Sequence, residues 1–235
     1  MQFGVDEAGK GPALGSMFAA AVSLEDPATL PGGIADSKRL APERREELAS
    51  TLREDERIRV GVAEITPARI DDPETDMNSL AVAAHANAIV AAHDELAADA
   101  LESTPISGLC DACDTDASRF ARRVADACSD AAAAADADSS LLAHLEVDAR
   151  HGADDESPLV GAASIVAKVE RDAHVAALAE EYGQIGSGYP SDPTTREFLA
   201  SYVGERGELP PCARESWSTC ETVLAESQQT GLEQF

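Results

Sequence analysis

The chain has 235 residues, 44% of them hydrophobic, which is enough to bury the core of one well-packed domain with a small appendage. Its 44 aspartates and glutamates outnumber its 18 lysines and arginines, and the net charge of −26 argues against a protein that binds nucleic acid through a generally basic surface. No apolar run approaches the ~20 residues that span a bilayer, and the N-terminus lacks the basic-then-apolar pattern of a signal peptide, so we expect a cytoplasmic protein without a membrane segment.

The acidic excess is spread along the chain, and only three of the basic residues are lysines. Proteins from organisms with molar intracellular salt have this composition, because at about 1 M salt the Debye length falls to about 3 Å and self-repulsion is screened. The carboxylates then keep the surface hydrated. The composition therefore predicts a salt-loving source.

Five cysteines are present, and an odd number without a secretory signal predicts reduced thiols. Cys110 and Cys113 have the C-x-x-C spacing of a zinc-ligand pair. Cys128, Cys212 and Cys220 do not supply a second pair at a convincing spacing, so we expect no structural zinc.

Hydrophobic patterns predict strands alternating with helices. The chain opens with short strands over 2–7 and 17–24, joined by a glycine-rich turn, and a helix is expected from Asp36. The further expected elements are a strand over 58–65, a helix over 78–96, a strand over 105–112, a helix over 117–127, a loop or acidic helix extension over 129–140, a strand over 141–147 and a long helix from Pro158. This order predicts a mixed α/β architecture with helices packed on a sheet, followed by a turn over 186–193 and a C-terminal helical subregion.

A dense motif, GVDEAGKGPALG, spans residues 4–15 and places Asp6 and Glu7 at the end of an apolar strand. Adjacent strand residues point to opposite faces, so both carboxylates can reach one metal ion only where the strand ends or twists. Gly9 and Gly11 allow such a bend and allow a backbone to approach a ligand closely. Taken alone, the motif is equally consistent with a solvated strand end.

The same segment fits the phosphate-binding pattern G-x-x-x-x-G-K, with Gly4, Gly9 and Lys10 at the required spacing. Gly11 then stands where that loop needs a serine or threonine to bind magnesium. Two carboxylates inside the loop would also repel the phosphates. We therefore reject a P-loop.

Further carboxylates stand near the ends of later elements. Asp111 closes the fourth strand, and Asp154 lies just before the long helix, where a carboxylate is also a favourable cap. Asp114 and Asp116 resemble part of a calcium loop that lacks its central glycine and its final glutamate. For Asp111, Asp154 and the nearby His151, a structural role is the simpler interpretation when each is taken alone.

Two other motifs offer contacts to a nucleic acid. In DSKRL (36–40), the residues before Lys38 can cap the following helix, and Lys38 is a candidate phosphate contact. In GSGYPSDP (186–193), glycines and prolines fix a turn that presents Tyr189. A buried core tyrosine is the usual alternative to a ring that stacks on a sugar or base.

These motifs occur together in the order of a known family. GVDEAGKGPALG, DSKRL, the strand-ending Asp111, HGAD at 151–154, AASIVAKVERD and GSGYPSDP resemble type II ribonuclease H over about residues 2–220, and the tail resembles the archaeal branch. The resemblance implies a ribonuclease H-like fold, an α/β fold with a central mixed five-stranded sheet flanked by helices and a C-terminal helical subdomain. We accordingly expect a catalytic domain over 1–188 and a C-terminal helical subregion and tail over 189–235.

The resemblance also implies an endonuclease that hydrolyses the RNA strand of RNA–DNA hybrids and cuts 5′ to ribonucleotides embedded in duplex DNA. Asp6, Glu7, Asp111 and Asp154 would bind Mn²⁺ or Mg²⁺ and form the catalytic set. The implied substrate-binding residues are Gly9, Lys10 and Gly11 at the 2′-hydroxyl, Tyr189 on the deoxyribose, and Lys38 and Lys168 on backbone phosphates.

Two such ions about 3.5–4 Å apart can activate a water and stabilise the leaving oxygen, which gives 5′-phosphate and 3′-hydroxyl ends. Oxygen-only ligands suit these hard ions. The family's usual Gly-Arg-Gly is Gly-Lys-Gly here, and because the two cations are not equivalent, substrate affinity or metal preference can differ. Asp114 and Asp116 compete with Asp111 as the third ligand, and Asp148 competes with Asp154.

Other functions remain open at this point. A type I or type III ribonuclease H or a resolvase would share the fold, but the GSGYPSDP turn and the AASIVAKVERD helix argue against type I, and the lack of a long N-terminal extension argues against type III. An acidic cation-binding or interaction protein is the non-enzymatic alternative. The ending GLEQF loosely resembles a clamp-binding peptide, so a sliding clamp is a candidate partner of a chain that we otherwise expect to be a monomer.

Overall fold

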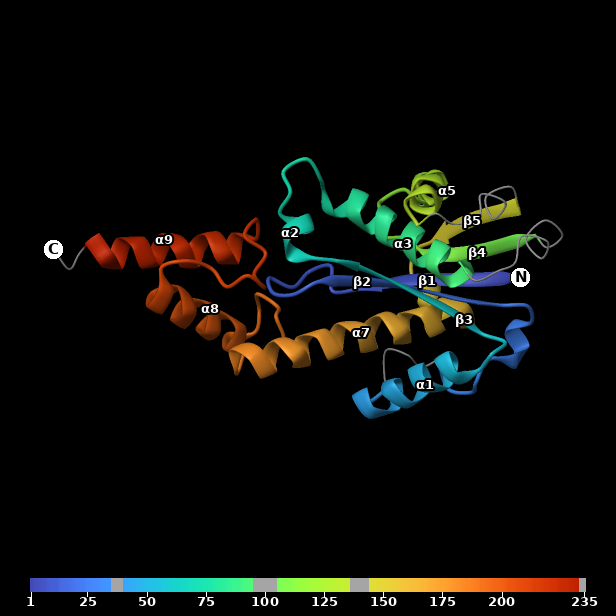
Figure 1. Cartoon of the computed structure of the whole chain (residues 1–235), viewed down its shortest axis with the longest axis horizontal. Coiled ribbons are helices and arrows are strands. Elements are labelled where there is room, and N and C mark those ends of the chain that lie inside the picture. Colours follow the sequence, from blue (N-terminus) through green and yellow to red (C-terminus); the bar gives the residue numbers. More distant parts are fainter. Residues whose placement is uncertain (35–39, 95–104, 136–143, 233–235) are drawn as a thin grey trace. The chain divides into compact units, whose positions relative to one another are not determined.

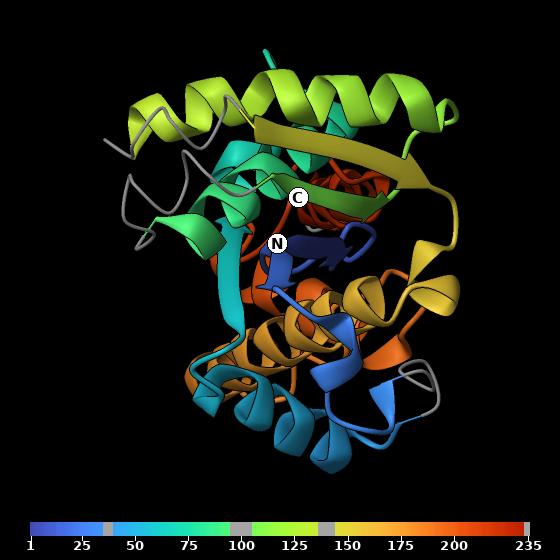
Figure 2. The ribbon, with the colours of Figure 1, turned by 90° about the vertical axis from the view of Figure 1, so that its right-hand side faces the viewer.

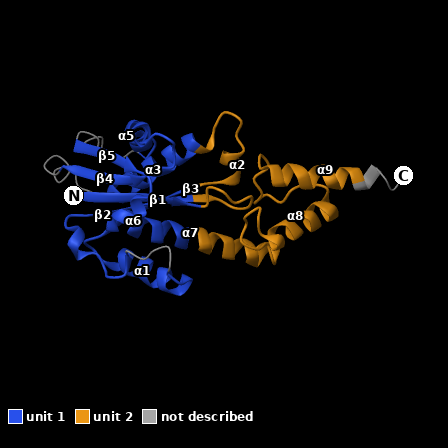
Figure 3. Ribbon diagram, turned by 180° about the vertical axis from the view of Figure 1, so that it is seen from behind, with its two compact units in different colours: residues 1–8, 18–64, 78–170 blue, residues 9–17, 65–77, 171–235 orange. Residues whose placement is uncertain are grey.

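A computed structural model describes residues 1–34, 40–94, 105–135 and 144–232. The chain forms two compact units (Figure 3). The first unit comprises Met1–Ala8, Phe18–Glu64 and Asn78–Glu170, and the second comprises Gly9–Met17, Ile65–Met77 and Arg171–Phe235. The chain therefore passes between the units several times. The expected functional division between residues 188 and 189 stays a prediction.

The first unit is built on a five-stranded sheet in the order β3-β2-β1-β4-β5. Its strands are β1 (Gln2–Ala8), β2 (Met17–Leu24), β3 (Arg59–Ile65), β4 (Ile106–Asp111) and β5 (Leu145–Arg150). β1 pairs antiparallel with β2 and parallel with β4, and β4 pairs parallel with β5. The predicted mixed five-stranded sheet is confirmed.

Helices cover both faces of this sheet (Figures 1 and 2). Helices α3 (Met77–His93) and α5 (Ala117–Ala134) lie on one face, and α1 (Pro42–Glu54) and the beginning of α7 (Pro158–Tyr182) lie on the other. On the second face, apolar side chains of β2, α1 and α7 pack into one buried core. The short helix α6 (Ala153–Glu156) directly precedes α7, and the 3-10 helix η1 (Pro27–Thr29) follows β2.

Three element bounds differ from the sequence-based expectations. The helix expected from Asp36 begins at Pro42, and residues 35–39 lie outside the described residues. Helix α5 continues to Ala134, as the alternative of a helix extension predicted. The last strand covers Leu145–Arg150 and so ends three residues beyond the predicted end at Val147, residues 141–143 lie outside the described residues, and α6 was not predicted. β5 is an edge strand in which apolar residues alternate with charged ones, but only Ala149 is buried.

Glycine allows α3 to lie directly against the sheet. A Cβ added to Gly61 of β3 would stand 2.2 Å from the carbonyl oxygen of Ala88 and 2.3 Å from the backbone nitrogen of Ala92. Backbone atoms of a packed helix cannot rotate away, so a larger residue must displace the helix.

We expect Gly61→Ala to lower the free energy of unfolding by about 1–3 kcal/mol, measured by urea denaturation in molar KCl. The matched control is Gly204→Ala in α8 (Pro193–Arg206), where an added Cβ meets nothing within 4 Å. This control replaces a helical glycine and should stabilise the chain by about 0.5–1 kcal/mol. A Gly61→Ala chain as stable as the parent would contradict the close contact of α3 with β3.

The second unit contains α2 (Pro67–Ile70), the end of α7, α8 and α9 (Ser218–Leu232). Its buried core consists of Ala13, Leu14, Ile185, Leu199, Cys212, Ala213 and Cys220. The turn between β1 and β2 belongs to this unit, because the Ala13 amide donates to the Gly188 carbonyl at 2.8 Å and the Arg214 amide donates to the Ala13 carbonyl at 2.8 Å. Among the described residues, no helix is long and apolar enough to cross a membrane.

All five cysteines are free thiols. Burial raises the pKa of the Cys128 thiol to about 12 and raises the pKa of Cys110 well above its ordinary value. At neutral pH both side chains are therefore protonated and pack as small apolar groups.

Candidate active site

Asp6 and Glu7 lie within β1 and point to opposite faces of the sheet. Asp6 is 6% exposed and faces α7, where the Ser164 hydroxyl donates a hydrogen bond to its carboxylate. Glu7 faces α3, where its Oε2 lies 2.8 Å from Nε2 of His85. β1 continues to Ala8, so the ordinary alternation of strand side chains applies to both residues.

Asp111 and Asp154 join Asp6 in the first unit. Val5 of β1 is paired with Cys110 of β4, and the next residue on each strand is Asp6 and Asp111, respectively. Asp111 Oδ1 accepts a 2.8 Å hydrogen bond from the amide of Ala153, the first residue of α6. Asp154, the second residue of α6, is 6% exposed. Parallel strand pairing and the start of one helix thus gather three of the predicted carboxylates.

The negative charge of this cluster is not balanced. Burial, and then the charge of Glu7, raises the pKa of Asp6 to about 7. Burial, and then the charges of Asp154 and Glu7, raises the pKa of Asp111. A bound cation would relieve this repulsion.

The carboxylates fit a hard divalent cation by their donor atoms and their charge. Within the residues that the structure describes, however, no three histidine, cysteine, aspartate or glutamate side chains converge so as to hold an ion as they stand. Binding would therefore require some of these side chains to change rotamer.

The aspartates that compete for these roles have other contacts. Asp114 accepts a 2.6 Å hydrogen bond from Arg119, which is the first cause of the fall in the pKa of Asp114 to about 2. Asp116 caps the N-terminus of α5. Asp148 is 67% exposed and lies 3.8 Å from Arg150. These contacts give Asp114 and Asp116 a structural role, whereas Asp148 is an exposed side chain of the edge strand.

The two predicted phosphate-binding lysines are placed differently. Lys168 Nζ donates a 2.8 Å hydrogen bond to Ser164 Oγ, and Ser164 in turn donates to Asp6, so Lys168 lies near the carboxylates. Lys38 lies outside the described residues. His151 donates from Nδ1 to the Ala112 carbonyl at 3.1 Å, as expected of a polar neighbour.

Gly9, Lys10 and Gly11 belong to the second unit, where the chain's tail holds their carbonyl groups. The guanidinium of Arg214 donates to the carbonyl oxygens of Gly9 at 2.6 Å and Lys10 at 3.0 Å, and Trp217 Nε1 donates to that of Gly11 at 3.2 Å. Gly9 has a φ of 89°, which favours glycine. Because C=O and N–H of a trans peptide point in opposite directions, the amides of Lys10 and Gly11 face away from Arg214.

Tyr189 lies next to this turn and is 39% exposed, so it is not a buried core tyrosine. A Cβ added to Gly11 would stand 3.6 Å from the Tyr189 ring, and the guanidinium carbon of Arg171 lies 5.1 Å from the ring centroid. Asp192 accepts a 2.6 Å hydrogen bond from the Ser187 amide and so stiffens the turn. The second unit therefore presents an accessible aromatic ring beside the glycine-rich backbone.

Three partners of these residues were missed by the sequence analysis: His85, Ser164 and Arg214. His85 gives a weak signal, since it and His93 are the two polar residues among the otherwise aliphatic buried residues of α3. Ser164 is one small residue among many in α7. Arg214 gives none, because a fully buried arginine runs against the usual distribution of charged residues.

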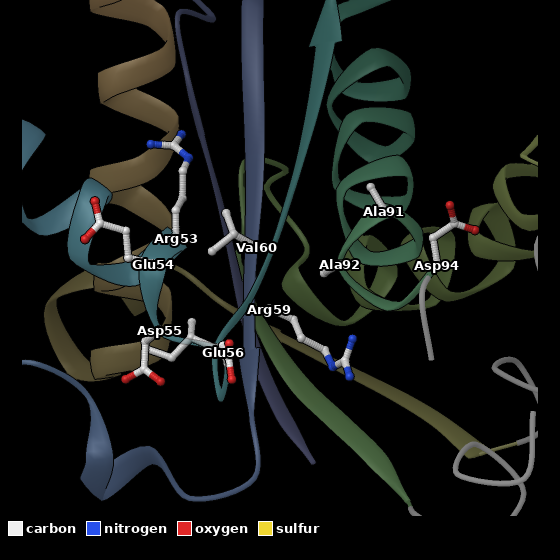
Figure 4. A pocket seen from close by; sticks show the side chains of 10 residues that line it. Arg53, Glu54, Asp55, Glu56, Arg59, Val60, Ala91, Ala92 and Asp94 are labelled. Carbon is white, nitrogen blue, oxygen red and sulfur yellow. The ribbon is translucent and has the colours of Figure 1, made fainter. Parts of the chain in front are cut away.

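A hollow of about 510 Å³ lies elsewhere in the first unit, and its side chains come from the end of α1, the beginning of β3 and the end of α3 (Figure 4). Its lining consists of Arg53, Glu54, Asp55, Glu56, Ile58, Arg59, Val60, Ala91, Ala92 and Asp94. It contains none of the predicted site residues.

The family model described as Ribonuclease HII matches residues 3–220. The chain belongs to the ribonuclease HII family. A ribonuclease HII of Haloarcula marismortui is 59% identical over 235 residues, which are 100% of each chain. The ribonuclease H2 structure from Pyrococcus horikoshii has a TM-score of 0.78 and 33% identity, and the match covers 97% of this chain and 99% of that one. Ribonuclease HII from a PCNA complex of Archaeoglobus fulgidus has a TM-score of 0.76 and 33% identity, covering 95% and 96%.

The ribonuclease HII family cleaves the RNA of RNA–DNA hybrids, and this chain is an endoribonuclease of that family. The family resemblance found in the ordered motifs is confirmed, and so is the ribonuclease H-like fold. The match at 59% identity comes from a haloarchaeon, in agreement with the acidic composition.

Proposed function

We propose that this chain hydrolyses the RNA strand of RNA–DNA hybrids and also cuts 5′ to ribonucleotides embedded in duplex DNA, leaving 5′-phosphate and 3′-hydroxyl ends. Asp6, Glu7, Asp111 and Asp154 would hold two divalent cations, Mn²⁺ or Mg²⁺. The observation that carries the proposal is the gathering of partly buried carboxylates without a balancing charge: burial first, and then their mutual repulsion, raises the pKa of Asp6 and of Asp111. When bound, the ions would activate a water and stabilise the leaving oxygen.

The glycine-rich turn supports recognition of a ribose. Arg214 and Trp217 hold the carbonyl groups of the turn, so the amides of Lys10 and Gly11 point to the other side. Backbone amides in this position can bind a 2′-hydroxyl, which DNA lacks. The exposed ring of Tyr189 can pack on a neighbouring sugar. In this proposal Lys38 and Lys168 bind backbone phosphates.

The proposal includes adaptation to high salt. A chain with a net charge of −26 repels a polyanion at low ionic strength, and at about 1 M salt this repulsion acts over only about 3 Å. The bound metal ions and a few positively charged side chains near the site then bind the phosphates, as a basic surface does in other proteins.

We also propose a sliding clamp as partner, because the tail GLEQF loosely resembles a clamp-binding peptide and the Archaeoglobus relative was solved with PCNA. The monomeric state and the cytoplasmic location stay predictions.

The test uses an end-labelled duplex that carries one ribonucleotide. The duplex and the protein are incubated with Mn²⁺ or Mg²⁺ in a series of KCl concentrations from about 0.1 M to about 3 M. We expect a single cut on the 5′ side of the ribonucleotide, with activity persisting at molar salt. An all-DNA duplex and the variant Asp111→Asn are the negative controls. Absence of cleavage at every salt concentration would refute the proposed function, and cleavage confined to below about 0.2 M would refute only the salt adaptation.

A further inference from the structure

His85 is a fully buried histidine of α3 that contacts one of the proposed metal ligands. Its Nε2 lies 2.8 Å from Oε2 of Glu7, and its exposed fraction is 0%. Its ring packs edge-on against Phe120 of α5, with centroids 5.1 Å apart and an interplanar angle of 86°. Apart from His85 and His93, the buried residues of α3 are all aliphatic. Packing alone therefore gives no reason for an imidazole at this position.

Within the residues that the structure describes, one of the two ring nitrogens of His85 takes part in a hydrogen bond. Its Nδ1 is buried and has no hydrogen-bond partner within the described part of the chain. His93 of the same helix differs, because its Nδ1 lies 2.7 Å from the Ile89 carbonyl and its Nε2 lies 3.0 Å from Ser23 Oγ. A proton on Nδ1 of His85 would be a buried donor without an acceptor, which costs free energy. The proton therefore lies on Nε2, and Nε2 donates a hydrogen bond to Glu7. Among the described residues, the polar partner of this ring is thus the Glu7 carboxylate.

The strand geometry explains why Glu7 needs a contact on this face. The Asp6 side chain points from β1 toward α7, where Ser164 donates a hydrogen bond to it. The Glu7 side chain points from β1 toward the aliphatic face of α3. A glutamate has one more side-chain torsion than an aspartate, so its carboxylate samples more positions unless a neighbour fixes it. The hydrogen bond from His85 fixes one carboxylate oxygen, and the packed Phe120 fixes the imidazole.

We propose that His85 is a positioning residue that orients the Glu7 carboxylate for a divalent cation. This role rests on the metal-dependent function proposed above, since the orientation of Glu7 matters only if the carboxylates bind a metal ion. Groups that hydrogen-bond to metal ligands typically contribute about 10- to 100-fold to metal affinity. His85 acts through Glu7 and does not itself contact the substrate.

The test measures Mn²⁺ binding to the full chain by isothermal titration calorimetry, in molar KCl and without substrate. His85→Phe keeps a ring against Phe120 but removes the donor, and it should raise the Kd for Mn²⁺ by about 10- to 100-fold. His85→Gln places an amide donor near the position of Nε2 and should restore most of the affinity. His93→Phe removes the other buried histidine of α3 and serves as the matched control, with an unchanged Kd. Asp111→Asn removes a proposed ligand and should abolish tight binding.

Two results would overturn the proposal. If the parent binds Mn²⁺, Asp111→Asn does not, and a cooperatively folded His85→Phe chain binds as the parent does, the role of His85 fails and the proposed function stands. If the parent binds no Mn²⁺, both fail.

Should His85→Phe not fold, the comparison of His85→Gln with His85→Asn decides the question, because the shorter amide cannot reach Glu7. Weaker binding by His85→Asn supports the proposal, and equal binding refutes it. In cleavage assays, a positioning role predicts a higher Mn²⁺ concentration for half-maximal activity with little change in kcat at saturating metal.

Discussion

Asp6→Asn is expected to abolish metal-dependent cleavage and, at the same time, to stabilise the metal-free protein. Removal of this carboxylate takes away a proposed ligand at the centre of the cluster, and we expect a fall in the cleavage rate of about 10³-fold or more. The gain in stability follows from burial, because Asp6 is 6% exposed and lies beside other carboxylates. The Asp6 carboxylate is thus proposed to be necessary for cleavage and, at the same time, to lower the stability of the folded metal-free protein.

The pH dependence of this cost has a definite sign. Burial, and then the charge of Glu7, raises the pKa of Asp6 from 3.8 to about 7. The proton on the folded chain therefore stabilises the fold fully below about pH 4, and this stabilisation is lost as the pH rises through about 7. The loss is on the order of 2–4 kcal/mol across this window. Asparagine is neutral throughout, so most of this pH dependence should disappear in the variant.

Thermal unfolding with a chelator at about pH 5 and about pH 8 measures this effect. We expect the variant to exceed the parent in Tm at the higher pH and to match it more closely at the lower pH. Added Mn²⁺ should raise the Tm of the parent and leave that of the variant unchanged. Asp148→Asn, which removes an exposed carboxylate of the edge strand, is the control and should alter neither property. A variant that cleaves at the parental rate would exclude Asp6 from the site.

The sequence predicted strands β1 to β4 to within one residue at each end, and β5 only in part. Strand β2 is buried along its whole length and its nearly continuous apolar run identifies it, whereas the edge strand β3 is identified by its alternation and its β-branched residues. β5 alternates apolar residues with Glu146, Asp148 and Arg150, but the prediction stopped at Val147, three residues before the strand ends, and residues 141–143 lie outside the described residues.

The candidate site shows a similar limit. Asp6 and Glu7 stand in a local motif, but the residues that hold the site come from distant segments: His85 is 78 residues from Glu7, and Arg214 is 205 residues from Gly9. Neither partner follows from local periodicity or spacing. Both are buried polar side chains, and composition rules place such residues at the surface unless a partner is known. Their positions required the tertiary structure.

Arg214→Met is expected to cause a large loss of stability. Arg214 is 0% exposed and donates hydrogen bonds to three carbonyl oxygens, those of Gly15 at 2.9 Å, Lys10 at 3.0 Å and Gly9 at 2.6 Å. Burial lowers the pKa of Arg214 to about 10, so the guanidinium still carries its charge at neutral pH. Its removal leaves these carbonyls without charge-assisted donors, and we expect a loss of about 3–5 kcal/mol and a fall in Tm of roughly 10 °C.

The matched control for this variant is Arg206→Met in α8. The guanidinium carbon of Arg206 lies 5.2 Å from the Tyr202 ring centroid, much as that of Arg214 lies 5.0 Å from the Trp217 ring centroid, but Arg206 is exposed. We expect this control to change stability by no more than about 0.5 kcal/mol. The comparison separates burial and hydrogen bonding from the contact between a cation and a ring.

Arg214→Lys tests which property of the arginine holds the turn. Lysine keeps the charge but offers one ammonium group in place of a planar fork, so it cannot reach all three carbonyls at once. We expect a stability between those of Arg214→Met and the parent, and cleavage of the single-ribonucleotide duplex with a raised KM. If Arg214→Lys were as stable and as active as the parent, charge alone would hold the turn. The fixed direction of the Lys10 and Gly11 amides, on which the proposed recognition of a 2′-hydroxyl depends, would then lack its structural basis.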